Sequence, residues 1–466
     1  MKVLLLSANR EHAPYPVFPL GLAYLAGSLK EAGHELSVLD LCFTPDPVAA
    51  TRHAVAAFAP DATVVSLRNI DNVTYPGSRS YLDGVRDVVG ATSGHGVTIV
   101  GGSGFSLMPR EILDFLDVDY GVVGEGEEVL PLLLAALAGD GDPSLLPGVV
   151  RRGAGDFLPP QPVLGIGTPD RSLFDVARYH RDGGMANLQT KRGCPFSCIY
   201  CTYPLLEGRG MRLRPVGEIV AEIRSLVDGG VSYLYFVDDI FNYPPEFAHE
   251  LCLAMAGAKL PVSWSAFINP DFFTPRLLDA MLAAGCDALE FGTDSGSPAM
   301  LKNLSKSFDV DQVREASRLC RESEVDFAHY ILFGGPGETA ATVTESFILM
   351  DELAPTAVIA MTGIRIFPGT AIHGQALAEG IITPETNLLE PVFYLSPEVA
   401  PILCDLVRSE AVKRTNWVVP GLEITANEAM LEALRHFAVT GPLWKMLKRF
   451  NRRRTAPFNP CRPSPS

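Results

Sequence analysis

The chain has 466 residues, enough for two or three domains of ordinary size. Its residues are 47% hydrophobic and 20% charged, which supports sizeable cores and excludes a disordered chain. The net charge of −16 argues against a nucleic-acid-binding protein, because phosphate contacts need clustered positive charge. No apolar stretch reaches the ~18–20 residues that span a bilayer, and the apolar run at the start is too short for a signal peptide. We expect a soluble, cytoplasmic protein.

The first 140 residues (1–140) alternate short apolar strands with helices. The expected strands are 2–7, 35–41, 62–67, 98–100 and 120–123, and the expected helices are 20–32, 48–59, 80–89, 109–116 and 129–138. This order is typical of βαβ units, so the segment is predicted to form a doubly wound, Rossmann-like parallel sheet. Such sheets bind ligands at the carboxyl ends of their strands.

A stretch rich in Gly, Pro and Asp follows and indicates a linker over 141–178. The next block, 179–375, alternates again, with expected strands at 186–190, 233–237, 263–268, 288–292, 327–333 and 358–366. Six βα units favour a partial (β/α)6 TIM-like barrel, since a full barrel needs eight. The remainder, 376–450, is expected to be mainly helical, and the Pro- and Ser-rich end, 451–466, to be disordered. The overall class is therefore α/β.

Three of the nine cysteines, Cys194, Cys198 and Cys201, lie within eight residues in the sequence TKRGCPFSCIYC. The C-x3-C-x2-C spacing directly follows an expected strand, and thiolates bind iron–sulfur clusters and zinc. A structural zinc site wants four ligands, and the next His or Cys residues, His249 and Cys252, lie beyond another strand. The motif therefore favours a [4Fe–4S] cluster with one iron left open. A zinc site and three unrelated buried cysteines are the alternatives.

This motif, with Tyr200 before its last cysteine, resembles the signature of radical S-adenosylmethionine (SAM) enzymes. The resemblance covers about residues 180–375. It implies that the three cysteines are the catalytic cluster ligands and that SAM binds the open iron through its amino and carboxylate groups. In this family an electron from the cluster cleaves SAM to a 5′-deoxyadenosyl radical, which abstracts hydrogen from an unactivated carbon. The resemblance also implies an electron donor such as flavodoxin or ferredoxin.

Three more segments follow barrel strands, at the edge where the active sites of such barrels lie. FVDDIFN contains Asp238 and Asp239, and the resemblance implies that one of them contacts the SAM amino group, although the common GGE form is absent. FGTDSGS resembles the family segment G-x-E-S-G-S and implies Ser295 as a SAM contact. FGGPGET contains three glycines that the adenosine can approach closely: Gly334, Gly335 and Gly337. Each segment alone would also suit an ordinary turn.

The N-terminal sheet resembles the cobalamin-binding domain that precedes many radical SAM domains. The resemblance rests on PLGLAYLAGSLKEAGHELSVLD and on SLRNID, GGSGFS and GVVGEGE at strand ends. The motif D-x-H-x-x-G is absent, which implies base-off cobalamin without a protein histidine on cobalt, and Arg68 beneath the corrin. The expected backbone contacts are Gly101, Gly102, Ser103 and Gly104. The alternatives are a surface or ion-paired Arg68 and a docking domain that has lost cobalamin.

The leading hypothesis is a cobalamin-dependent, class B-like radical SAM C-methyltransferase. The resemblance implies two uses of SAM, with methylcobalamin delivering methyl to an unactivated carbon of a natural product or lipid. The alternatives are a B12-dependent radical SAM cyclase or rearrangement enzyme, a polar cobalamin-dependent C-methyltransferase, and a non-catalytic cobalamin or cluster sensor. A methylthiotransferase is disfavoured because it needs a second cluster, and the first 190 residues contain only Cys42.

Several other residues have two interpretations each. His329 falls on an expected strand, where it is a structural residue or faces the barrel cavity. Cys252, Cys286 and Cys320 lie in apolar surroundings and are expected to be packing residues. A basic run near the C-terminus is a solvated helix face or a contact for an anionic membrane surface or an acidic carrier: Lys445, Lys448, Arg449, Arg452, Arg453 and Arg454.

Overall fold

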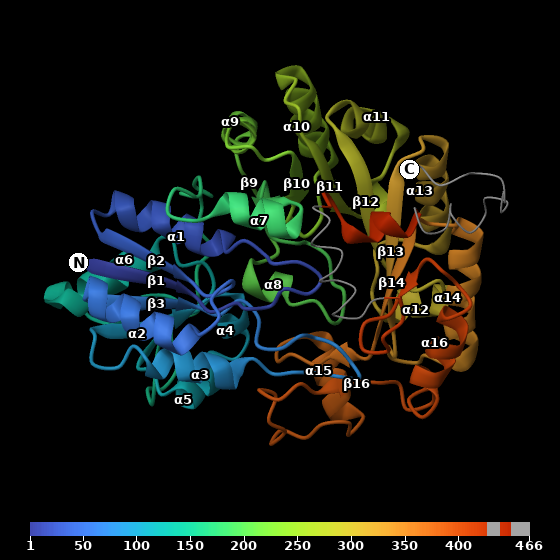
Figure 1. Ribbon diagram of the computed structural model, residues 1–466. Coiled ribbons are helices and arrows are strands. Elements are labelled where there is room, and N and C mark those ends of the chain that lie inside the picture. Colours follow the sequence, from blue (N-terminus) through green and yellow to red (C-terminus); the bar gives the residue numbers. More distant parts are fainter. Residues whose placement is uncertain (426–438, 449–466) are drawn as a thin grey trace, which may run out of the picture.

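A computed structural model describes residues 1–425 and 439–448 of the chain. Two sheets lie side by side, and the short helix α8 (Tyr203–Leu206) lies between them (Figure 1). The N-terminal sheet has the strand order β2-β1-β3-β4-β5-β6, and the second sheet has the order β17-β14-β13-β12-β11-β10-β7. This arrangement confirms the predicted α/β class with two successive parallel sheets.

The N-terminal sheet consists of short apolar strands: β1 (Lys2–Ser7), β2 (Glu35–Asp40), β3 (Ala62–Ser66), β4 (Val97–Gly101), β5 (Tyr120–Val122) and β6 (Val149–Arg151). The first five are parallel, and β6 runs antiparallel to β5. The segment expected to be a linker thus completes this sheet. Val149 and Val150 explain the difference, because their side chains are buried, 4% and 2% exposed, at the sheet's outer edge.

Helices cover both faces of this sheet: α1 (Leu20–Glu31), α2 (Pro47–Phe58), α3 (Leu82–Gly90), α4 (Ser103–Leu107), α5 (Pro109–Leu116) and α6 (Val129–Ala135). On β1, Leu5 packs in the core cluster that includes α1 and α6, whereas its neighbour Leu6 packs in the cluster that includes α3 and α5. Successive strand residues point to opposite faces, so a strand covered on both faces must be apolar throughout. The run VLLLS therefore forms a central strand.

The second sheet has seven parallel strands: β7 (Ala186–Leu188), β10 (Tyr233–Phe236), β11 (Ser263–Ile268), β12 (Cys286–Asp294), β13 (Asp326–Phe333), β14 (Ala357–Thr362) and β17 (Trp417–Val418). The first six are the strands predicted for the partial barrel. The seventh, β17, comes from the region expected to be mainly helical.

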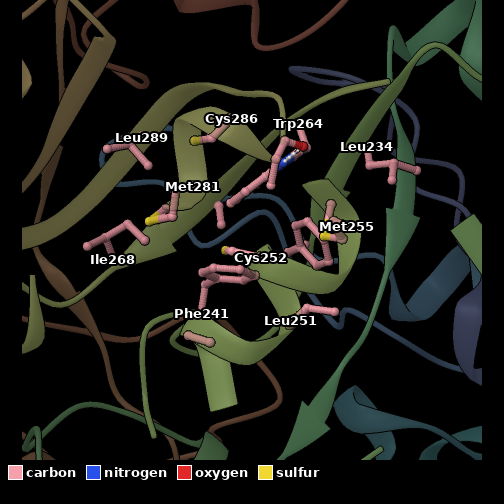
Figure 2. Packing of buried hydrophobic residues seen from close by; sticks show 14 of the residues in the cluster. Leu234, Phe241, Leu251, Cys252, Met255, Trp264, Ile268, Met281, Cys286 and Leu289 are labelled. Atoms are coloured by element: carbon pink, nitrogen blue, oxygen red, sulfur yellow. Dashed lines mark hydrogen bonds between the residues drawn. The ribbon is translucent and has the colours of Figure 1, made fainter. Parts of the chain in front are cut away.

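Helices cover the outside of this barrel-like sheet: α7 (Val176–Gly183), α9 (Val216–Asp228), α10 (Pro245–Ala258), α11 (Pro275–Ala283), α12 (Pro298–Asn303), α13 (Val310–Glu322) and α14 (Ala340–Leu353). Figure 2 shows the core beneath α10 and α11, where Trp264 donates a hydrogen bond to the carbonyl oxygen of Ala284 at 2.9 Å. Cys252, Cys286 and Cys320 are buried in this core, which confirms them as packing residues.

Of the region expected to be mainly helical, the described residues 376–425 and 439–448 also contain short strands. The helices are α15 (Ala371–Ala378) and α16 (Leu403–Ala411), and β16 (Phe393–Tyr394) pairs with β15 (Ile364–Arg365). In the part of the chain that the structure describes, the longest helices have 14 residues, too short to cross a bilayer.

The segment 439–448 returns to the barrel and forms the floor of its interior. Trp444 donates a hydrogen bond to the buried carboxylate of Glu290 at 2.8 Å. Lys445 and Lys448 form ion pairs with Asp287 and Asp326, near the amino ends of β12 and β13, both at 2.7 Å. These two residues of the basic run thus bind the barrel itself. The rest of the run and the tail expected to be disordered at 451–466 lie outside the described residues.

Candidate active site

A cavity of about 1270 Å³ lies between the two domains and continues into the barrel. It exceeds the ~300–1,000 Å³ that is usual for one small ligand, so it has room for more than one molecule. The N-terminal domain lines it through residues between Glu11 and Val17 and between Arg68 and Tyr81. The barrel adds an aromatic wall: Tyr235, Phe267, Tyr330 and Trp444.

The three predicted cluster ligands all line this cavity. Cys194, Cys198 and Cys201 are free thiols, and their loop begins after β8 (Lys191–Arg192), which pairs with β9 (Arg212–Leu213). Gly193 has φ +95°, and a Cβ there would lie 2.3 Å from the carbonyl oxygen of Gly210, so this turn needs glycine.

The donor chemistry of the three thiols suits an iron–sulfur cluster. Within residues 1–425 and 439–448, no three His, Cys, Asp or Glu side chains converge as ligands of one ion do. A [4Fe–4S] cluster instead takes each thiolate on its own iron. Burial raises the pKa of Cys194 to about 11 and that of Cys201 to about 12. Loading iron must therefore displace protons from these thiols.

Asp238 and Asp239 have different environments. Asp238 is buried, accepts hydrogen bonds from the backbone and hydroxyl of Thr190 at 2.6 and 2.5 Å, and pairs with Lys191 at 3.1 Å. Asp239 also lines the cavity, but its Oδ2 has no partner among the described residues. Burial, with the nearby carboxylates of Glu207 and Asp238, raises its pKa to about 9. Asp239 is thus a neutral acid near pH 7, and a cation beside it would favour its ionised form.

An ion pair between Lys306 and Asp294 also lies near the cysteines, and the sequence analysis did not predict Lys306 as a site residue. Lys306 lines the cavity and pairs with Asp294 at 2.7 Å, and the Tyr200 hydroxyl donates a hydrogen bond to the same carboxylate. Asp294 ends β12, whereas Lys306 lies in the loop before α13. Nothing in the local sequence around Lys306 marks it, because only the fold brings it beside Cys198.

Four of the expected SAM contacts do not line the cavity: Ser295, Gly334, Gly335 and Gly337. The Ser295 hydroxyl is buried, 3.1 Å from the Ser346 hydroxyl, and accepts from the amide of Ser297. In the glycine-rich turn, the amide of Gly334 donates a hydrogen bond to the carboxylate of Glu338. Burial raises the pKa of Glu338 to about 7. SAM binding by these four residues stays a prediction. The contacts that the structure shows for their two segments are within the protein.

The GGSGFS turn packs against the end of β3. A Cβ at Gly102 would lie 2.7 Å from the oxygen of Leu67, and one at Gly104 would lie 2.9 Å from that of Arg68. The Ser103 hydroxyl donates to the same Arg68 oxygen at 3.0 Å. This contact explains the glycines without a ligand. It also holds the backbone of Arg68, whose guanidinium lines the cavity and has no hydrogen bond or ion pair with a described side chain.

His329 does not face the cavity. Its ring lies between the hydroxyls of Thr293 at 2.7 Å and Ser317 at 3.0 Å, and it stacks on Phe291 with the ring centroids 5.2 Å apart. Burial lowers the pKa of His329 to about 3. Of its two interpretations, the structural one is therefore confirmed.

The buried His329 predicts loss of stability in acid. An unfolded histidine takes up a proton near pH 6.5, but the folded one does so only near pH 3, so its stabilising contribution is complete above pH 6.5 and falls as pH falls toward 3. At pH 5 the loss is about 2 kcal/mol. We expect His329→Gln to remove this part of the pH dependence of the free energy of unfolding. His53→Gln, at an exposed position, is the control, and equal slopes for both variants would contradict the prediction.

Comparison with known families identifies the two domains. A model of the B12 binding domain matches residues 6–134, and a model of the radical SAM superfamily matches residues 188–349, which includes the cysteine loop. The chain is a B12-binding radical SAM enzyme. Its cofactors are a [4Fe–4S] cluster, SAM and cobalamin, and as a radical SAM enzyme it needs an electron donor.

The enzyme's relatives include methyltransferases. It is 26% identical to tryptophan 2-C-methyltransferase of Streptomyces laurentii, over 81% of this chain and 74% of that protein. It is 22% identical to cytidylyl-2-hydroxyethylphosphonate methyltransferase of Streptomyces wedmorensis, over 92% and 93%. The solved structure of the radical SAM methyltransferase TsrM from Kitasatospora setae has the same fold, with a TM-score of 0.86, 24% identity, and coverage of 97% of this chain and 99% of that one. The enzyme is thus related to class B methyltransferases.

Proposed function

We propose that the enzyme transfers a methyl group from SAM, by way of cobalamin, to an unactivated carbon of a small molecule. The observation that carries the proposal is one shared cavity. The three cysteines of the barrel and Arg68 of the B12-binding domain all line it. When bound, the cluster and SAM supply a 5′-deoxyadenosyl radical, and cobalamin supplies the methyl group. Relatives named tryptophan 2-C-methyltransferase and bacteriochlorophyllide d C-12(1)-methyltransferase support methyl transfer, whereas two others are named as magnesium-protoporphyrin IX monomethyl ester cyclases.

The charged side chains around the cysteines suit the amino-acid end of SAM. Asp239 offers an unpaired carboxylate oxygen for the ammonium group, and Lys306 offers a cation for the carboxylate. Lys306 is held by Asp294 at 2.7 Å, which fixes its direction. We assign SAM binding to these two residues, whereas Asp238 holds the turn that precedes the cysteine loop.

The barrel wall favours a substrate with a ring. Tyr235, Phe267, Tyr330 and Trp444 give the inner part of the cavity flat apolar surfaces, which pair well with planar ligands. A ring-containing natural product therefore fits this wall better than an extended lipid chain. A flavodoxin or ferredoxin is the proposed electron donor.

The test is made on anaerobically reconstituted enzyme with cobalamin, reductant and SAM. Formation of both S-adenosylhomocysteine and 5′-deoxyadenosine, with cobalamin bound, is the expected result. Deoxyadenosine without S-adenosylhomocysteine would favour the cyclase or rearrangement enzyme instead. S-adenosylhomocysteine alone, in the presence of ring-containing candidate substrates that become methylated, would favour the polar route. Cofactor binding without either nucleoside would favour a sensor and overturn the proposal.

A further inference from the structure

Four charged side chains join the B12-binding domain to the hairpin that carries the cysteine loop. Glu125 and Glu127 follow β5, at the carboxyl edge of the N-terminal sheet. Arg212, on β9, binds the Glu125 carboxylate with two nitrogens, at 2.5 and 2.7 Å. Arg192, on β8, donates to Glu127 at 2.6 Å and lies 3.5 Å from Glu125. We call these four residues the acidic–arginine joint.

The joint is buried and geometrically demanding. Its side chains are between 7% and 16% exposed. The Glu125 carboxylate also accepts from the amide of Val163, so it holds the connecting segment as well. The Arg192 guanidinium lies over the ring of Tyr24 on α1, 4.7 Å from its centroid. Buried arginine–carboxylate pairs of this kind have strong directional preferences, so the joint defines one relative position of its two sides.

The hairpin transmits that position to the first cluster ligand. Arg192 precedes Cys194 by two residues, and the backbone of the intervening Gly193 packs directly against the carbonyl group of Gly210. The amide of Gly193 donates to the Glu207 carboxylate at 2.9 Å, and the amide of Cys194 donates to the oxygen of Gly208 at 3.1 Å. Any shift of Arg192 must therefore move the start of the cysteine loop.

We propose that Glu125 and Glu127 are positioning residues that set the distance between the cluster and the cobalamin. They line no part of the cavity and act through Arg192 and Arg212. The inference rests on the proposed function, because a methyl group that passes from SAM to cobalamin requires both cofactors at a fixed separation. A shift of about 1 Å in such geometry can lower a rate about 100-fold.

A second contact holds the domains together without the joint. Arg365 on β15 forms a buried ion pair with Asp71 at 2.9 Å, and both side chains are 1% exposed. The Thr362 hydroxyl donates to the oxygen of Tyr75 at 2.5 Å nearby. Weakening the joint should therefore change the relative placement of the domains while leaving them attached.

The test uses the reconstituted holoenzyme with Glu125→Gln and Glu127→Gln, which keep side-chain size and remove charge. Pulsed EPR measures the distance between the reduced cluster and cob(II)alamin, and a separate assay follows S-adenosylhomocysteine formation. We expect full binding of both cofactors, a shifted or broader distance distribution, and product formation lower by on the order of 100-fold. The control is Asp156→Asn, the same acid-to-amide change in an exposed ion pair with Arg110, which should leave both readouts at their wild-type values.

Glu127→Asp keeps the charge and shortens the side chain, so it provides the test if a glutamine variant does not fold. We expect Glu127→Asp to move the distance distribution as well. A wild-type distance distribution in a folded variant that lacks the Glu127 contact would overturn the proposal. If the wild-type enzyme forms no S-adenosylhomocysteine, the proposed function fails, and the distance measurement still decides the role of the joint.

Discussion

Replacing Cys198 with alanine is expected to abolish SAM cleavage. Three thiolates are proposed to hold the cluster, and Cys198 lies in the middle of their loop, on the cavity. With two ligands the cluster is not retained, and the reaction falls to its uncatalysed rate, at least about a millionfold lower. The measurement is iron content, the visible absorbance of the cluster and the yield of 5′-deoxyadenosine after anaerobic reconstitution.

Cys252→Ala is the matched control for this variant. Cys252 lies on α10 and is fully buried in the core, and it does not line the cavity, so the same substitution there should leave iron content and SAM cleavage near wild type. Full iron content with undiminished SAM cleavage in Cys198→Ala would show that Cys198 is not a ligand.

Replacing Asp239 with asparagine is expected to weaken SAM binding by about 10- to 100-fold. A hydrogen bond to a charged group contributes about 1.5–3 kcal/mol, and the unpaired Oδ2 of Asp239 is the proposed partner of the SAM ammonium. Equilibrium dialysis of the reconstituted enzyme with SAM measures the change. Asp238→Asn is the contrasting variant. It removes the acceptor for Thr190 and Lys191, so it should lower thermal stability. An unchanged affinity in Asp239→Asn would assign the ammonium elsewhere.

The raised pKa of Asp239 also predicts that Asp239→Asn changes how the stability of the protein depends on pH. An acid that titrates near pH 9 when folded and near 4 when unfolded stabilises the fold fully only below pH 4, and that stability is lost as pH rises toward 9. Asparagine has no such loss. Asp239→Asn should therefore make the cofactor-free protein more stable at pH 8 than the wild type, with a smaller difference at pH 5. Thermal unfolding at the two pH values measures this.

Elements with a strong hydrophobic period were predictable from the sequence. The N-terminal strands agree within about two residues, most clearly β1, where Val3 to Leu6 are all apolar and fully buried because helices cover both faces. Of the strands of two or three residues, β5 and β7 were predicted, but others were missed, including β6, β16 and β17. Such strands carry too few residues for a period and form because a neighbouring strand edge offers hydrogen bonds.

The residues of the candidate active site also divide into those that the local sequence predicts and those that it does not. The cysteine loop was predictable because metal ligands need one residue type at close spacing, and local sequence records that need. Lys306 and the acidic–arginine joint were not predictable in this way. Their partners lie 12 to 87 residues from them along the chain, and nothing local marks which charged residues will meet.

The sequence by itself determined the cofactor chemistry, the two-domain α/β organisation and the absence of a histidine motif for cobalt. Tertiary structure decided which of Asp238 and Asp239 has a free carboxylate oxygen, and whether each glycine-rich turn borders the cavity or packs on a strand. The physical reason is the range of the interactions. Periodicity and ligand spacing act over a few residues, whereas burial and charge pairing depend on segments that only the folded chain brings together.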